Sequence, residues 1–332
     1  MRYLFFALLL AACSTPQPPA SIASSATDQA HAACTATAGE MPQLVGITVS
    51  DDAADFEDMR TLRVTDEASG GFLLVHYDSG SEAMARATAA CLGAQIATIG
   101  REVGDERKAA QWDSVVFTQT AFNNLTSPGE VTRWPVFVQD DSQLDFRSVK
   151  AIGWVIPHEQ VHAYQAQNGF NFPRWLAEGH AVWIDFKLAD RFDPIVTARQ
   201  IAARAQKAAE SEGPLKLLEW GKHQPRREAY YRQVGDEERA KMDADLSYYP
   251  SGVFTFTDDD FEVEYVANDQ ARYLAAFRVL KGLEDRHGAA AVHAWIADLV
   301  KSHNAPISDG VVDTSLQTHF GETLDEVLDN LG

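Results

Sequence analysis

The residues with the clearest chemical meaning are two histidines four apart, in the segment His158-Glu159-Gln160-Val161-His162. On a helix, residues at i and i+4 lie on the same face, so both imidazoles can reach one metal ion. Glu159 is rotated off that face and can touch a water on the metal without ligating the metal. Glu178 follows sixteen residues after His162 and can supply a third ligand. Three protein ligands leave a fourth position open, so the spacing predicts a catalytic zinc site.

The segment around Glu178 predicts a second helix. Glu178 is followed by Gly179, and apolar residues flank the pair on both sides, which is typical of an amphipathic helix. Pro173 lies just before Arg174, where a proline suits a helix start. A histidine pair on a helix can also be a plain surface or core feature. The glutamate on a second helix favours the zinc interpretation.

These two segments together resemble the gluzincin metallopeptidases, and among them the bacterial peptidase MA-like proteins. The family pattern is HExxH followed by W-L-x-E-G-x-A, which here is Trp175, Leu176, Glu178, Gly179 and Ala181. The resemblance runs from about Gly71 to the C-terminus, although only the two helices are specific. It implies that His158, His162 and Glu178 bind zinc and that Glu159 is the catalytic base. His180 lies two residues beyond Glu178, so on a helix it points to the opposite side and is not expected to be a ligand. Asp185 can support a ligand histidine from behind or face solvent, and the pattern favours the solvent-facing position.

The resemblance also implies a second donor to the oxyanion, usually a tyrosine or histidine of the helical part. Tyr265 is the first candidate, because it precedes the helix predicted around Leu274. The next candidates are Tyr248, Tyr249 and His223. Tyrosines more often pack with their rings in the core and their hydroxyls in water than act in catalysis.

The N-terminus predicts export and lipid anchoring. Residues 1–12 form a signal peptide with Arg2 and a short apolar run that is too short to span a bilayer. The ending Leu10-Ala11-Ala12-Cys13 resembles a bacterial lipobox, in which Cys13 is lipidated; the alternative is an ordinary signal peptide with an incidental cysteine. Ser14 favours the outer membrane, facing the periplasm or the cell surface. Residues 13–42, rich in Ser, Thr, Ala and Pro, predict a flexible tether.

Once Cys13 is set aside, an even pair of cysteines remains. Cys34 and Cys91 can form a disulfide in an oxidising compartment, or Cys91 can be a buried thiol on an apolar stripe. The formal net charge of −20 argues against nucleic acid as a partner. The expected partners are a peptide or protein substrate and, through the lipid anchor, the membrane.

Residues 43–332 predict an α+β, zincin-like metallopeptidase domain. Its mixed β-sheet lobe with the HExxH helix covers residues 43–168, and its mainly helical lobe covers 169–332. The expected strands are 44–49, 61–65, 71–77 and 136–138; the last is expected at the sheet edge, where it pairs with substrate. The expected helices are 81–101, most of the chain after Ser148, one that Gly288 ends, the next around 292–299, and a last one near 324–331. Pro157 either starts the HExxH helix or kinks a longer one from Ser148.

The leading hypothesis is therefore an envelope-anchored zinc peptidase, with an endopeptidase preferred over an aminopeptidase. One alternative is a non-catalytic, zinc-containing envelope binding or scaffold protein on a peptidase fold. A third interpretation has no metal and treats the motif as a coincidence.

Overall fold

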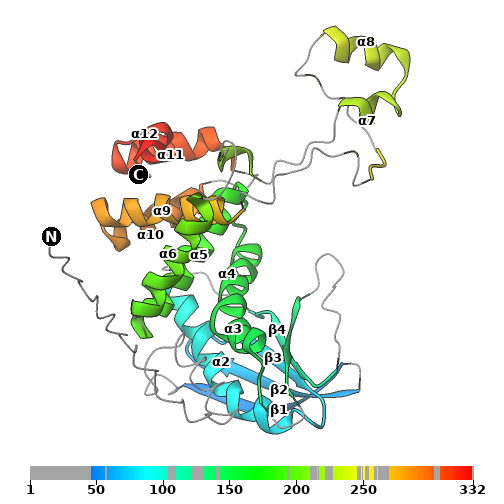
Figure 1. Ribbon diagram of the computed structural model, residues 1–332, viewed down its shortest axis with the longest axis vertical. Coiled ribbons are helices and arrows are strands. Elements are labelled where there is room, and N and C mark those ends of the chain that lie inside the picture. The colour runs from blue at the N-terminus through cyan, green and yellow to red at the C-terminus, as the bar shows by residue number, and fades with distance from the viewer. Residues whose placement is uncertain are drawn as a thin grey trace, which may run out of the picture.

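A five-stranded mixed sheet and a set of helices make up the computed structural model, which is α+β as the sequence predicts (Figure 1). The structure describes residues 46–56, 58–103, 110–120, 131–139, 143–192, 194–209, 215, 217–220, 227–244, 248, 250, 254–257, 260, 269–302 and 307–330. The predicted signal peptide and tether lie outside these residues. Among the described helices, none combines the length and the apolar character that crossing a membrane needs.

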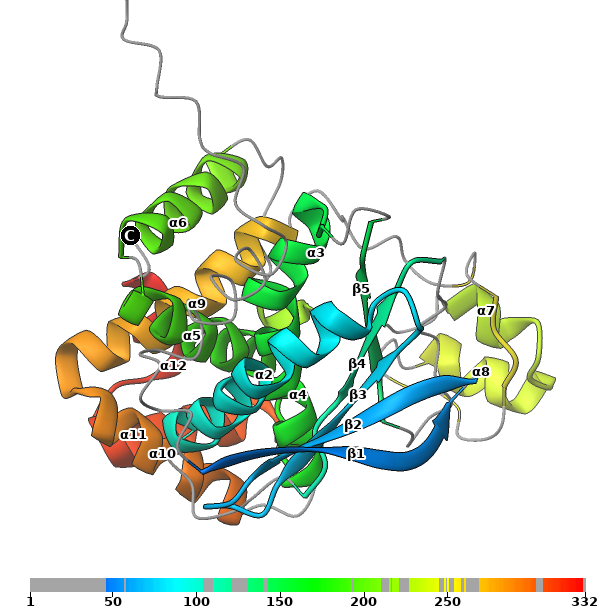
Figure 2. The same cartoon turned by 90° about the horizontal axis from the view of Figure 1, so that it is seen from below.

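The sheet has the strand order β1-β2-β3-β4-β5 (Figure 2). The strands are β1 (Ile47–Phe56), β2 (Met59–Asp66), β3 (Phe72–Tyr77), β4 (Ser114–Thr118) and β5 (Arg133–Phe137). β1, β2 and β3 pair antiparallel, whereas β3, β4 and β5 pair parallel. β1 continues well beyond the predicted 44–49 segment. The sequence prediction missed β4, because all five of its residues are buried and no apolar–polar alternation marks it.

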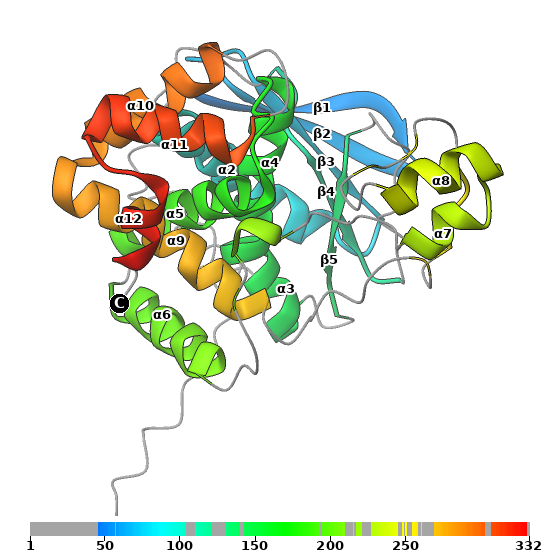
Figure 3. The ribbon, with the colours of Figure 1, turned by 90° about the horizontal axis from the view of Figure 1, so that it is seen from above.

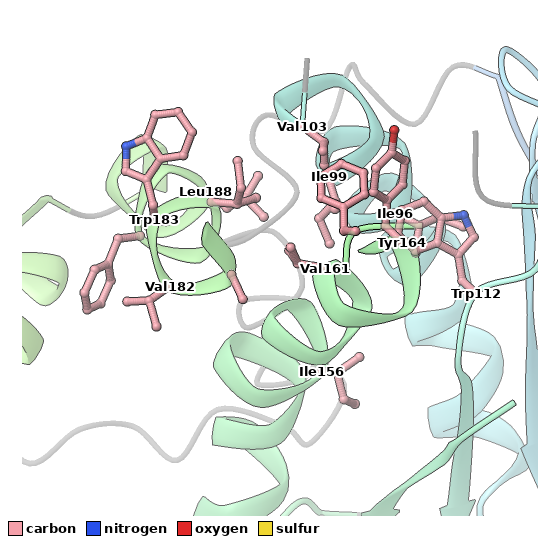
Figure 4. Close-up of a cluster of buried hydrophobic side chains, with 14 of the residues drawn as sticks. Ile96, Ile99, Val103, Trp112, Ile156, Val161, Tyr164, Val182, Trp183 and Leu188 are labelled. Atoms are coloured by element: carbon pink, nitrogen blue, oxygen red, sulfur yellow. The ribbon is translucent and has the colours of Figure 1, made fainter. Parts of the chain in front are cut away.

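The parallel connection from β3 to β4 contains the long helix α2 (Glu82–Glu102), which lies across one face of the sheet (Figure 2). Ser81 is at the N-cap position as predicted, but its side chain makes no capping hydrogen bond. Buried side chains of α2 then meet those of α4 (Ile156–Gln167) and α5 (Arg174–Phe192), as Figure 4 shows for Ile99, Val161 and Leu188. The sheet, α2 and the metal-motif helices therefore share one hydrophobic core.

The described residues after α5 are mainly helical, as expected. These elements are α6 (Pro194–Ala209), η3 (Leu217–Glu219), α7 (Arg227–Tyr231), α8 (Asp236–Ala244), α9 (Asp269–His287), α10 (Ala289–Lys301), α11 (Asp309–Phe320) and α12 (Leu324–Asp329). α5, α6 and α9 pack on one another, and α10, α11 and α12 lie beyond α9 (Figure 3). The predicted ends of α9 and α12 are confirmed within a few residues.

Pro157 lies inside a continuous helical run, so the helical segment that contains the HExxH motif begins before the proline. α3 (Phe146–Lys150) leads through a π-helical turn, η2 (Ala151–Val155), directly into α4. The N–H of Ile156 reaches back five residues to the carbonyl of Ala151. In the same pattern the N–H of residue 157 would donate to the carbonyl of Ile152, but residue 157 is a proline and has no N–H. The buried Gln95 of α2 donates its amide to that carbonyl at 3.0 Å, so the carbonyl keeps a partner.

Gly179 sets the distance between α5 and α9. A Cβ atom placed on it would lie 2.7 Å from the backbone oxygen of Ala276, which is too close for any side chain. Ala276 is itself fully buried, so neither helix can move aside easily. The glycine in the Glu178-Gly179 pair is therefore required by close helix packing.

We expect Gly179→Ala to lower the free energy of unfolding by about 1–3 kcal/mol, because the added methyl overpacks the α5–α9 contact. Urea unfolding of the full-length protein measures this. Gly282→Ala in the interior of α9 is the matched control, since its Cβ would meet only the flexible guanidinium of Arg286 at 3.1 Å. There the better helix propensity of alanine should add about 0.5–1 kcal/mol. Equal effects of the two substitutions would contradict the packing role of Gly179.

Candidate metal centre

The structure brings the three predicted ligands together. The Nε2 atoms of His158 and His162 on α4 are 3.2 Å apart. The Oε2 atom of Glu178 on α5 is 3.3 Å from the first nitrogen and 3.2 Å from the second. One ligand atom from each residue lies within 4.8 Å of the other two, and no other such group of three occurs among the described residues.

This arrangement has the size of a zinc site. Zinc bonds of about 2.0–2.1 Å in tetrahedral geometry place neighbouring ligand atoms about 3.4 Å apart. The separations here are 3.2 to 3.3 Å, and all three atoms point to one place. Two histidines and one carboxylate are also the donor set of a catalytic zinc site with an open position. The residues therefore fit a zinc ion.

Arg174 holds the other oxygen of Glu178. Its Nε atom is 3.6 Å from Oε1, while Oε2 faces the histidines. The guanidinium also lies over the Trp220 ring, 4.9 Å from its centre, in a cation–π contact. Glu178 is thereby oriented to offer a single oxygen to the metal position.

Burial and charge shift the titration of the ligands in different directions. Burial lowers the pKa of His158, which keeps that imidazole neutral. Burial also opposes the charged form of His162, but its hydrogen bond to Glu178 and the charge of that carboxylate outweigh burial and raise its pKa. Burial opposes ionisation of Glu178 as well, yet hydrogen bonds with both imidazoles hold its pKa well below the usual range. The Glu178 carboxylate and the His162 imidazole thus favour each other's charged forms.

Glu159 lies beside the ligands and is not one of them. Burial, opposed by the charge of His162 and aided by the charges of Glu178 and Asp113, raises the pKa of its carboxyl to about 6. A carboxylate with a raised pKa is a better proton acceptor than a surface glutamate. Its position and its basicity suit a general base.

Tyr273, which sequence reasoning missed, lies at the site. Its ring centre is 6.1 Å from that of His158 and 4.8 Å from that of Trp220. Burial, with the charge of Glu178 beside it, raises the pKa of Tyr273 to about 12, so its hydroxyl keeps its proton at neutral pH. The residue lies in the first turn of α9, four positions before the core residue Phe277. The sequence pattern predicts a helix here, around Leu274, but it gives Tyr273 no role.

The tyrosine and histidine candidates from the sequence are elsewhere or outside the described residues. Tyr265, Tyr249 and His223 lie outside them. The Tyr248 hydroxyl donates to Glu238 of α8 at 2.6 Å.

Two further expectations concern α5. His180 is fully buried and lies outside the ligand group, as predicted. The expectation that Asp185 faces solvent is wrong, because its side chain is 2% exposed. Burial raises the pKa of Asp185 well above its usual value, and the nearby Arg204 only partly offsets this. Asp185 lies on the face of α5 that packs inward, which the apolar residues around it already indicated.

β5 is the outermost strand of the described sheet on this side, as predicted, but its outer edge is short of donors. The N–H of Val138 donates to the backbone oxygen of Thr118 on β4. The backbone N–H and C=O groups of the odd-numbered residues of β5 therefore point to the outer edge of the sheet. Pro135 has no N–H, and the N–H of Phe137 donates to Ser148 Oγ at 2.9 Å. A peptide lying along this edge would find carbonyl acceptors there but would miss two donors.

Cys91 is buried on α2, and its predicted disulfide partner Cys34 lies outside the described residues. The pairing of these two cysteines, like the lipidation of Cys13, stays a prediction.

Among solved structures, the chain is similar to an M1 zinc metallopeptidase from Deinococcus radiodurans, with a TM-score of 0.40 and 15% identity. A mutant form of that enzyme gives a TM-score of 0.38 at the same identity. In both comparisons the match covers 86% of this chain and 51% of the other, so the chain spans about half the length of these enzymes. No protein-family model and no curated protein sequence matches the chain. With similarity this low, the chemistry has to be derived from the residues of the site.

Proposed function

We propose that this protein is a zinc-dependent peptidase in which Glu159 acts as the general base. The observation that carries the proposal is the convergence of His158, His162 and Glu178 at 3.2 to 3.3 Å, with a half-buried glutamate of raised pKa beside them. Its substrate would be a peptide or a protein. The N-terminal sequence supports anchoring to the cell envelope through lipidated Cys13, and the outer membrane is the proposed location.

Each polar residue of the site has a defined task in this proposal. Zinc held by His158, His162 and Glu178 would activate a water molecule and polarise the carbonyl of the scissile peptide. Glu159 accepts the proton of the attacking water and passes it to the leaving amine. The Tyr273 hydroxyl, which stays protonated, donates a hydrogen bond to the oxygen on which negative charge develops. Arg174 keeps Glu178 oriented.

The alternative is a non-catalytic, zinc-containing envelope binding or scaffold protein. Such a protein needs the three ligands but has no use for a base of raised pKa beside them. Glu159 and the protonated Tyr273 favour hydrolysis, because burying both groups costs stability without helping a purely structural site.

The purified full-length protein should bind about one zinc per chain, and His162→Ala should lose most of it, because two ligands cannot replace three. Elemental analysis after zinc reconstitution measures this. The control is His319→Ala on α11, a histidine paired with Asp298 at 3.1 Å, which should keep the metal. A wild type without zinc would exclude both the peptidase and the zinc-scaffold hypothesis.

Glu159→Gln should keep its zinc and lose about 10²–10⁴-fold in kcat/KM on a cleavable peptide, since the amide accepts no proton. The measurement is cleavage of a peptide library and then of one selected substrate. Glu237→Gln, at a position 87% exposed, should be fully active. In the wild type, kcat/KM should fall as the pH drops below about 6, because the base works only when ionised. Bound zinc lowers that pKa, so the acid limb would lie at or below pH 6. Equal inactivity of wild type and Glu159→Gln across the library would favour the scaffold alternative.

Tyr273→Phe should lower kcat about 10²–10³-fold with zinc content and KM little changed, because one donor to the developing oxyanion is removed. The same substitution at Tyr248, whose hydroxyl is bonded to Glu238, should leave kcat unchanged. Steady-state kinetics of the two variants compares them directly. If kcat fell in Tyr248→Phe and stayed unchanged in Tyr273→Phe, Tyr273 would not be the oxyanion donor.

A further inference from the structure

A buried glutamine links two of the proposed ligands. Gln165 lies three residues after His162 on α4, and its side chain is almost fully buried. Its Oε1 atom is 2.8 Å from Nδ1 of His162. Its Nε2 atom is 3.0 Å from the backbone oxygen of Ala177 and 3.1 Å from Nδ1 of His180.

The chemistry of these neighbours fixes the orientation of the amide. The carbonyl of Ala177 can only accept, so the nitrogen end of Gln165 must face it. The oxygen end therefore faces His162, and an amide oxygen can only accept. His162 must then carry a hydrogen on Nδ1, which leaves Nε2 free to face the metal position.

The second hydrogen of the Gln165 amide extends the hydrogen-bond network to His180. It points at Nδ1 of His180, which accepts and so places the hydrogen of this neutral imidazole on Nε2. His180 is fully buried, and both hydrogens of the Gln165 amide are used. The bonds of Gln165 thus have assigned donors and acceptors, and among the described residues Nε2 of His180 is left without a partner.

The same side chain ties two helices together. His162 lies on α4, while the Ala177 carbonyl belongs to the peptide group that precedes Glu178 on α5. A change in the distance between the helices would break at least one of these bonds. Gln165 therefore couples the position of one ligand to that of another.

We infer that Gln165 is a positioning residue, which holds His162 as its Nδ1–H tautomer and fixes it relative to Glu178. This inference rests on the proposed zinc site. It assigns no contact with substrate to Gln165. Partners of this kind behind a metal ligand typically contribute about 10–100-fold in metal affinity or activity.

Gln160 provides a matched control on the same helix. It is also buried, but its amide pairs with the backbone of Asp113, accepting from the N–H and donating to the carbonyl at 2.9 Å each. Gln165→Leu and Gln160→Leu remove the same groups from comparable surroundings, and only the first touches a proposed ligand.

The experiment measures zinc affinity by competition with a chromophoric chelator, and urea stability of the metal-free proteins. Gln165→Leu should weaken zinc binding about 10–100-fold, whereas Gln160→Leu should destabilise the fold with much less loss of zinc affinity. Gln165→Glu should recover part of the affinity, because its carboxylate still accepts from His162 while losing both donors. If affinity falls equally in the two leucine variants, or not at all in Gln165→Leu, the positioning role is wrong.

A second measurement separates this inference from the proposed activity. Nitrogen-15 NMR of the histidines in the metal-free protein, at about pH 9 where imidazoles are neutral, reports which ring nitrogen carries the hydrogen. Wild-type His162 should be in the Nδ1–H form, and Gln165→Leu should show a mixture. A wild type that binds zinc but cleaves no peptide would end the proposed function and leave this result standing. An unchanged tautomer in Gln165→Leu would overturn the inference even in an active enzyme.

Discussion

The site depends on one constraint, which is that every polar group on the buried faces of α4 must have a partner. An unpaired buried donor or acceptor costs about 1–3 kcal/mol. Three glutamines meet this requirement. Gln160 forms hydrogen bonds with the backbone of Asp113, and Gln165 forms one with His162. Gln95 of α2 donates to the carbonyl that Pro157 leaves without a partner. A neutral side chain with two donors and an acceptor can do this without adding charge near the metal. The helix is thereby held on several sides before any ion binds.

A second contact sets how closely α5 approaches α9 at the site. Gly179 lets α5 approach the backbone of α9 at Ala276, and the neighbouring Glu178 is the third ligand. Tyr273 lies on α9 about one turn before Ala276, so the same contact places the tyrosine beside His158. One glycine therefore fixes both a ligand and the proposed oxyanion donor. The Glu-Gly pair of the motif combines a chemical requirement with a packing requirement.

The sequence predicted those parts of the site that depend on short-range patterns along the chain. His158 and His162 are placed by helical periodicity, and Glu178 follows from a second recognisable helix, so their convergence needed little knowledge of the fold. Tyr273 was missed because it shares its helical stripe with core residues, and only the packing of α9 on α5 brings it to the histidines. β4 was missed because burial on both faces removes the alternation that marks a strand. The π-helical turn before Pro157 depends on Gln95, far away in the sequence, and local patterns do not contain such contacts.

The electrostatics of the site link metal retention to base strength. Burial gives Glu159 its raised pKa, while the contact with Glu178 raises the pKa of His162 against the effect of burial. Because zinc takes its ligands without their protons, its binding weakens as the pH falls. A more solvated site would lower the pKa of Glu159, and its carboxylate would be a weaker base. The burial that makes Glu159 useful in hydrolysis thus costs stability in the metal-free protein, and bound metal offsets that cost because it binds only the folded state.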